Sequence, residues 1–283
     1  MKIILKEIIK LIRIPNCILS GFGVIVGAFL EGYYNPFILS LGFLVGFFIT
    51  AYAMIINDYY DIEIDKVNAP NRPLASGKVK IKTALILAVL LLVAGLAISA
   101  LINLLSLAVA ILFAFISYLY SWRFKRSGLI GNFLVASSMA IPFIYGSIIS
   151  MKFGPLPFIL AGVAFFAGTS REIIKGISDV EGDKKKGVKT LTITKGAKKA
   201  SAYAFTLMII AVILSFLPLL YFKIWYVYLI LILTVDFFMI KYTYGLIKNP
   251  DGKKAIYVKN RILLMMFGAL LVFLISGVVG YVV

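Results

Sequence analysis

Long apolar segments alternate with short polar segments along this chain of 283 residues. The hydrocarbon core of a bilayer is about 30 Å thick, so an α-helix needs about 20 mostly apolar residues to cross it. Windows of that length predict spans at 14–33, 37–57, 81–101, 104–122, 129–150, 155–174, 198–220, 223–246 and 259–282. We therefore expect an all-α membrane protein with nine transmembrane helices, in which residues 1–283 form a single intramembrane domain.

The two longest polar segments, residues 58–80 and 175–197, each follow a predicted span. Each begins with polar side chains at intervals of four residues, a spacing that places them on one face of a helix. These side chains are Asn57, Asp61 and Asp65 in the first segment and Asp179 and Asp183 in the second. The repeated arrangement predicts two similar halves, each of a few helices with one acidic loop.

Basic residues dominate the charge, with 29 Lys and Arg against 12 Asp and Glu and a net charge of +17. If the N-terminus is cytoplasmic, nearly all of these cations fall on cytoplasmic segments, as the positive-inside rule requires; the exceptions are Lys152 and Lys223. We therefore expect a multi-pass protein of the cell membrane with a cytoplasmic N-terminus and cytoplasmic catalytic loops. This topology explains the positive charge without nucleic acid, and basic rims suit anionic lipid head groups and phosphorylated substrates.

The sequence has no histidine and a single cysteine, Cys17. One cysteine excludes an internal disulfide, and the lack of histidine excludes haem, most zinc sites and histidine-based relays. The acidic clusters offer only oxygen ligands, which favour Mg²⁺ or Mn²⁺, and Mg²⁺ takes one or two carboxylates together with substrate phosphates. The composition therefore predicts carboxylates that bind Mg²⁺ and, through it, a diphosphate.

Two known motifs nearly match the polar segments. An EF-hand loop that began at Asp61 would need glycine at its sixth position and glutamate at its twelfth, but Lys66 and Arg72 stand there. Residues 182–190 come close to a P-loop, but Val188 interrupts the pattern and no strand precedes it. Neither a calcium loop nor a nucleotide site is therefore expected.

Several basic side chains near the acids are candidates for holding phosphate oxygens. Arg171 and Lys175 share a helical face with Asp179 at the membrane edge. Arg72 lies in a rigid turn between two prolines, where its guanidinium could clamp phosphate in a way that a lysine could not. For Lys125 the positive-inside distribution is the simpler explanation, although it remains a candidate.

Arg13 is the only charged residue between Lys10 and Glu31, where the first span enters the membrane. Pro15 and Asn16 follow it, and they free backbone groups and add a polar side chain at a depth where polar groups tend to face a cavity. An ordinary interfacial arginine whose charge reaches out to water is the alternative. We expect Arg13 and Asn16 to line a chamber, with Arg13 contacting the phosphate of an acceptor.

Two aspartate motifs and the turn after the first of them form a specific set. They are Asn57-Asp58-x-x-Asp61-x-x-x-Asp65, Asn71-Arg72-Pro73-Leu74-x-Ser76-Gly77 and Asp179-x-x-x-Asp183. This set resembles the UbiA superfamily of intramembrane prenyltransferases. The resemblance implies nine helices around a central chamber, an isoprenyl diphosphate as donor, Mg²⁺ as cofactor, and catalytic roles for Asp61, Asp65, Asp179 and Asp183. The metal ligands it implies are these four residues with Asn57, and Asp58 is a further candidate.

Three segments are most similar to the archaeal-type branch of that superfamily that makes ether lipids: Arg13-Ile-Pro-Asn16, residues 120–132 and residues 171–183. The similarity implies transfer of a geranylgeranyl group from geranylgeranyl diphosphate to the free hydroxyl of geranylgeranylglyceryl phosphate, with release of diphosphate. The substrate-binding residues expected are Arg13, Asn16, Arg72, Tyr120, Lys125, Arg171 and Lys175. Tyr120 and Lys125 depart from the family's Tyr-x-x-x-Lys motif by one extra residue.

Two other functions remain open at the level of the sequence. The same chemistry with an aromatic acceptor would make the protein a polyprenyltransferase of quinone biosynthesis. A transporter or scramblase of phosphorylated lipids would use the same basic rim without catalysis, but bare carboxylates repel phosphate and argue against it. Membrane lipids are expected partners in every case, and the sequence predicts no particular oligomeric state.

Overall fold

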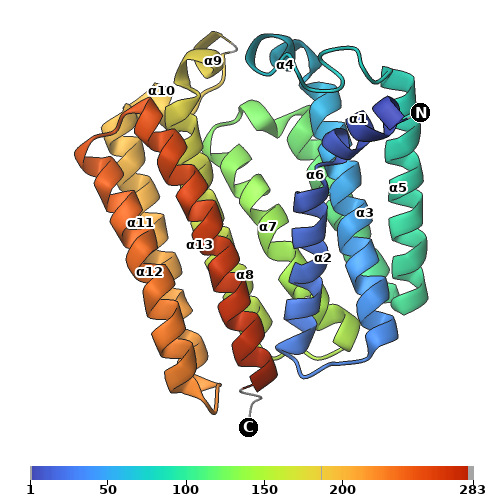
Figure 1. Ribbon diagram of the computed structural model, residues 1–283, viewed down its shortest axis with the longest axis vertical. Helices are drawn as coiled ribbons and strands as arrows, with labels where there is room; N and C mark the ends of the chain where they lie inside the picture. The colour runs from blue at the N-terminus through green and yellow to red at the C-terminus, as the bar shows by residue number, and fades with distance from the viewer. Residues whose placement is uncertain (1, 186, 280–283) are drawn as a thin grey trace. The chain divides into compact units, whose positions relative to one another are not determined.

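The computed structural model describes residues 2–185 and 187–279, and every regular element in those two ranges is a helix (Figure 1). Within this part of the chain, eight helices are long and apolar enough to cross a membrane. They are α3 (Pro36–Tyr60), α5 (Ile81–Ile102), α6 (Leu104–Trp122), α7 (Leu129–Ser150), α8 (Pro155–Ser178), α11 (Ala197–Ser215), α12 (Trp225–Lys248) and α13 (Gly252–Val279). The predicted all-α membrane fold is confirmed.

The first predicted span, 14–33, corresponds to α2 (Ile14–Phe29), which ends before residue 33 and is preceded by a break in the helix. α1 (Lys2–Ile12) and α2 meet at Arg13 with a bend of 50°, and together they make a ninth candidate span among the described residues. Arg13 has φ of 52°, in the left-handed region that few residues other than glycine adopt. Pro15 lies in the first turn of α2, where its missing N–H removes no helical hydrogen bond.

Shorter helices occupy the segments between the spans. They are α4 (Ile62–Asn68), η1 (Phe124–Arg126), α9 (Val180–Lys185), α10 (Leu191–Lys195) and η2 (Leu217–Leu220). The predicted loops are therefore partly helical, since α4 lies in the first and α9 and α10 lie in the second. The last predicted span reached residue 282, and residues 280–282 lie outside the described part of the chain.

The chain divides into two compact units. The first consists of Met1–Ile25 and Tyr34–Phe124, and the second of Val26–Tyr33 and Lys125–Val283. In the first unit α3 packs against α1, α5 and α6; in the second, α8 packs against α7, α11 and α13, while α12 packs against α11 and α13. Each unit carries one acidic motif, in agreement with the two halves expected from the sequence.

Polar caps fix where two spans of the first unit begin. The Asn35 side chain accepts hydrogen bonds from the backbone N–H groups of Phe37 and Ile38 at the start of α3, and Asn103 accepts one from Ser106 at the start of α6. These bonds satisfy N–H groups that a helix leaves unpaired at its first turn, which water cannot do inside a bilayer.

A buried carboxylate links α2 to α7 and α8 within the second unit. Glu31, which follows α2, accepts hydrogen bonds from Ser147 Oγ at 2.6 Å and from the Gly154 N–H at 3.1 Å. Lys152 Nζ donates to the Glu31 carbonyl at 3.1 Å. These contacts explain why residues 26–33 belong with α7 and α8, although the earlier part of α2 belongs to the first unit.

Candidate active site

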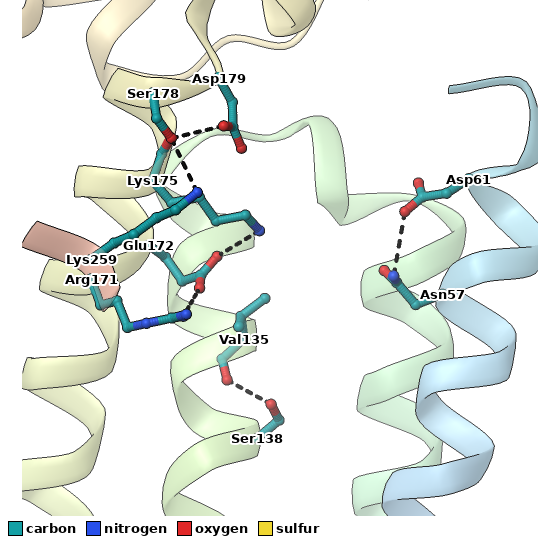
Figure 2. A network of polar contacts seen from close by, with 10 residues as sticks. All are labelled: Asn57, Asp61, Val135, Ser138, Arg171, Glu172, Lys175, Ser178, Asp179 and Lys259. Atoms are coloured by element: carbon teal, nitrogen blue, oxygen red, sulfur yellow. Dashed lines mark hydrogen bonds and ion pairs between the residues drawn. The ribbon is translucent and has the colours of Figure 1, made fainter. Parts of the chain in front are cut away.

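The acidic motif of the first unit lies where α3 passes into α4. Asp61 caps the end of α3 and stands immediately before α4. The backbone hydrogen bonds from Asp61 to Asn57 and from Asp65 to Asp61 continue the helical pattern across the junction. The interval of four residues therefore places Asn57, Asp61 and Asp65 on one face, as predicted. Asn57 Nδ2 donates to Asp61 Oδ2 at 3.3 Å (Figure 2).

Burial makes this motif electrostatically demanding. The exposed fractions are 2% for Asp58, 2% for Asp61 and 5% for Asp65, and buried charges need close partners of opposite sign. Burial raises the pKa of Asp65; the Arg72 guanidinium opposes the rise, and the neighbouring Asp61 and Asp58 carboxylates add to it. A cation beside this carboxylate would therefore lower the energy of the cluster.

Two arginines supply part of the missing positive charge. Arg13 Nη2 lies 2.5 Å from Asp58 Oδ1. Arg72 Nη1 lies 3.3 Å from the same oxygen and 2.6 Å from Asp65 Oδ2. Asp58 therefore binds an arginine from the break before α2 and another from the turn after α4. Asn16 does something different: its exposed amide lies 3.8 Å from Met54 Sδ on α3.

The second unit repeats this local architecture. α8 ends at Ser178, Asp179 caps it, and α9 begins at the next residue. Asp183 is the fourth residue of α9, just as Asp65 is the fourth residue of α4, and its N–H donates to the Asp179 carbonyl at 2.9 Å. A span, a capping aspartate and a short helix with a second aspartate thus occur once in each unit.

Neighbouring side chains hold Asp179 in place. Ser178 Oγ lies 2.8 Å from Asp179 Oδ1, and Lys259 Nζ on α13 donates to the same Ser178 oxygen at 3.4 Å (Figure 2). Nothing in the sequence indicated the role of Lys259, because it lies 81 positions from Ser178.

Three of the predicted phosphate-binding residues gather around Glu172, a residue of α8 to which the sequence assigned no role. Glu172 Oε1 accepts from Arg171 Nη1 at 2.9 Å, and Oε2 accepts from Lys175 Nζ at 3.3 Å (Figure 2). The charge of Lys125 also acts on this carboxylate. Its presence in a predicted span was a signal, because ionisable side chains in the membrane are usually functional.

Tyr120 and Lys125 fall in different units. Tyr120 is half-buried in the last turn of α6, and the boundary between the units follows Phe124. The aromatic residues around the end of α3 are better defined, because the Tyr60 and Tyr118 hydroxyls lie 3.5 Å apart and the Tyr118 ring stacks on Trp122. The sequence did not single out this group among its many aromatic residues.

Comparison with known proteins places this architecture in a family. The profile of the UbiA prenyltransferase family matches residues 20–271, most of the chain. The chain belongs to the UbiA prenyltransferase family. The resemblance carried by the aspartate motifs is therefore confirmed, and the protein is a multi-pass membrane prenyltransferase.

Among curated members of this family, the chain is 38% identical to digeranylgeranylglyceryl phosphate synthase of Methanocaldococcus jannaschii over 278 residues, or 97% of each chain. It is 40% identical to the synthase of Pyrococcus furiosus over 215 residues, or 75% of this chain and 77% of the relative. A solved structure of digeranylgeranylglyceryl phosphate synthase superposes with a TM-score of 0.81 at 35% identity, covering 98% of this chain and 99% of that one.

More distant UbiA proteins share the fold. A UbiA homologue from Archaeoglobus fulgidus, solved with DMAPP and Mg²⁺, superposes with a TM-score of 0.66 at 23% identity, over 94% of this chain and 99% of that one. A homologue from Aeropyrum pernix superposes with a TM-score of 0.73 at 18% identity, over 94% of this chain and 98% of that one.

The donor chemistry of the acidic motifs fits a hard cation. Among the described residues, no group of three or more His, Cys, Asp and Glu side chains is arranged to hold a metal ion by itself. The first unit contributes the adjoining Asn57 and Asp61, with Asp65 held by Arg72. Oxygen-only donors in small number suit Mg²⁺, which completes its shell with water and substrate phosphate. The oxygen donors of this motif therefore fit Mg²⁺.

Proposed function

We propose that this protein catalyses Mg²⁺-dependent transfer of a geranylgeranyl group from geranylgeranyl diphosphate to the free hydroxyl of geranylgeranylglyceryl phosphate. The observation that carries the proposal is the 38% identity, over 97% of both chains, to a digeranylgeranylglyceryl phosphate synthase. The structural similarity to a synthase at 35% identity agrees with it. The product would be a diether lipid phosphate, and diphosphate would be released.

We assign metal ligation to the two repeated aspartate motifs. The proposed ligands are Asn57, Asp61, Asp65, Asp179 and Asp183. When bound, Mg²⁺ supplies Lewis-acid stabilisation of the departing diphosphate. Asp58 was a further candidate in the sequence; because two arginines already contact one of its oxygens, we propose that it orients Arg13 and Arg72.

The reaction requires one bond to break and one to form. The bond between C1 of the prenyl chain and the diphosphate oxygen breaks, its electron pair stays with the diphosphate, and positive charge develops on the allylic carbon. A lone pair of the acceptor hydroxyl then forms the new ether bond, and the hydroxyl proton passes to the released diphosphate. The proposed role of the basic side chains is to bind and orient the phosphate groups of both substrates.

Purified protein, Mg²⁺ and geranylgeranyl diphosphate would test the acceptor directly. Incubation with geranylgeranylglyceryl phosphate should give the diether product, and 4-hydroxybenzoate should give none. Product from the aromatic compound alone would show that the acceptor is aromatic, as in quinone biosynthesis. If no isoprenyl diphosphate releases diphosphate in the presence of Mg²⁺, the transport of a phosphorylated lipid becomes the better explanation.

We also propose that the protein lies in the cell membrane with its N-terminus and aspartate motifs in the cytoplasm. The distribution of lysine and arginine supports this orientation. Single cysteines introduced at exposed Glu63 and Lys198, in a variant that lacks Cys17, should react with a membrane-impermeant maleimide only after the cells are opened. Labelling of intact cells would show that the orientation is the opposite of the one proposed.

A further inference from the structure

Glu172 is a buried carboxylate whose two oxygens each bind a cation. Oε1 accepts from Arg171 at 2.9 Å, and Oε2 lies 3.3 Å from the Lys175 ammonium. Only 8% of the Glu172 side chain is exposed. Since basic groups already contact both oxygens, Glu172 is poorly placed to bind a metal ion, in contrast to Asp179 at the end of α8 and Asp183 in α9.

The cations around Glu172 keep hydrogen-bonding capacity that the carboxylate does not use. A guanidinium has five N–H donors and an ammonium has three, and the contacts to Glu172 account for one donor of each. Arg171 Nε is buried and has no hydrogen-bond partner. A buried donor without a partner is unfavourable, the more so when it is charged, so an anionic ligand that accepted from it would be stabilised.

The charge of the cluster matches a particular class of ligand. Arg171, Lys175 and Lys125 contribute three positive charges, of which Glu172 neutralises one. The excess of two positive charges balances the charge of a phosphomonoester, which is about −1.5 to −2 at neutral pH. Without Glu172, three cations would repel one another at the membrane edge, and Arg171 and Lys175 would lose the carboxylate that both contact.

Arg171 and Lys175 lie on α8 a short distance before the proposed metal ligand Asp179. Lys175 precedes Asp179 by four residues and Arg171 precedes it by eight, which corresponds to about 6 and 12 Å along a helix. In the proposed acceptor the reacting hydroxyl and the phosphate-bearing oxygen are on neighbouring glycerol carbons. The acceptor phosphate must therefore lie close to the reacting diphosphate, yet in a subsite of its own.

We propose that Arg171 and Lys175, with Lys125, form the subsite for the phosphomonoester of the acceptor, and that Glu172 is the positioning residue that orients them. The inference rests on the proposed function, because it assigns part of that reaction's second substrate. Glu172 acts through the two cations and does not touch the reacting atoms.

The decisive experiment varies the protein and the acceptor phosphate together. Initial rates would be measured for the full-length protein and for Lys175→Ala, with geranylgeranylglyceryl phosphate and with the same lipid lacking its phosphate. Lys175 is 46% exposed, so its truncation should not unfold the protein. The matched control is Lys198→Ala, an exposed lysine in the first turn of α11.

For Lys175→Ala, KM for the phosphorylated acceptor should rise about tenfold or more, as expected for a lost hydrogen bond between charged groups. KM for the phosphate-free acceptor and for geranylgeranyl diphosphate should stay within about twofold, the scatter we allow for mutations that touch neither group. An equal rise for both acceptors, or a rise for the diphosphate alone, would overturn the subsite. If the unmodified protein gave no product with the phosphorylated acceptor and none with the phosphate-free acceptor, the proposed function would be contradicted instead.

The positioning role has its own test. Glu172→Gln keeps the shape of the side chain but loses the charge that holds both cations, so KM for the phosphorylated acceptor should rise while kcat changes little. In the double variant with Lys175→Ala, the change in the logarithm of KM should be smaller than the sum of the two single changes, because both substitutions act through one contact. Full additivity, or a fall in kcat with both acceptors at unchanged KM, would overturn the role of Glu172.

Discussion

Arg13 Nη2 lies 2.5 Å from Asp58 Oδ1, and this ion pair joins the break between α1 and α2 to the acidic end of α3. Left-handed backbone at a residue other than glycine costs roughly 1–2 kcal/mol, so the contact offsets strain at Arg13. It also fixes a cation beside a carboxylate cluster that is buried. Strained backbone is common at functional sites, so the unusual conformation of Arg13 points to a functional role.

Arg13→Ala should raise KM for the acceptor more than KM for geranylgeranyl diphosphate, because the sequence predicts that Arg13 contacts the acceptor phosphate as a further cation beyond the subsite proposed for Arg171, Lys175 and Lys125. The loss of one charged contact predicts a change of about tenfold. Steady-state kinetics with each substrate varied in turn would measure it. Lys6→Ala, which removes an exposed cation of α1, is the control and should have little effect. Equal changes for both substrates would make Arg13 an ordinary interfacial arginine.

Asp58→Asn should lower kcat/KM by about tenfold, since Arg13 and Arg72 would each lose a charged partner. Their side chains are about one third exposed, so water can compensate in part and the loss should stay well below that of a metal ligand. Turnover of the purified variant, compared with Asp61→Ala under the same conditions, would check this order. The reverse order would make Asp58 the more important ligand.

Asp61→Ala and Asp183→Ala should each reduce turnover by about a thousandfold or more, which corresponds to about 4 kcal/mol of lost transition-state stabilisation. Both variants should remain folded in detergent, as circular dichroism would show. Glu63→Ala is the matched control, because this acid of α4 has a side chain 81% exposed and forms a surface ion pair with Lys66. A folded Asp61 or Asp183 variant with nearly normal turnover would remove that residue from the proposed ligands.

Chelation of divalent metal should abolish diphosphate release, and Mg²⁺ or Mn²⁺ should restore it. The proposed donors are all oxygens and number too few to enclose a large ion, so Ca²⁺ should restore much less activity. Diphosphate release measured after dialysis against EDTA and addition of each metal would check this. Full activity in the chelated sample would contradict a metal-dependent mechanism.

Gly128→Ala should destabilise the protein more than Gly77→Ala. Both glycines have positive φ, 62° and 70°, so alanine carries a similar backbone cost at each position. A methyl group at Gly128 would overlap the carbonyl oxygen of Lys189, whereas one at Gly77 meets no atom within 4 Å. Thermal unfolding in detergent would compare them. Equal midpoints would show that the contact between Gly128 and Lys189 is not tight in solution.

Sequence patterns predicted the spans well because the thickness of the bilayer and the helical rise fix the length of an apolar segment. They also predicted the face shared by Asn57, Asp61 and Asp65, since local helical spacing survives the junction between α3 and α4. They treated the residues after Asp61 and Asp179 as loops, however. The short helices there carry too many charged residues to give an apolar pattern.

The partners of each charged side chain were less predictable. Arg13 and Asp58 are 45 residues apart, so their contact depends on the packing of α1 and α2 against α3 rather than on any local spacing. Glu172 was harder still, because its role follows from cations on both sides of it and from Lys125 on another element. Only tertiary structure shows which carboxylates a cation already occupies.

Lys152 bears on membrane insertion as well as on the contact with Glu31. In the proposed orientation it is one of two cations that run against the positive-inside distribution, and its ammonium binds the carbonyl of Glu31 while Ser147 and Gly154 hold the carboxylate. In that orientation a lysine at this position would oppose the final topology during insertion, but once α7 and α8 are in place it stabilises the link between them. One side chain would then act against insertion and in favour of the mature protein, and the proposed surplus of cytoplasmic cations would outweigh its effect on topology.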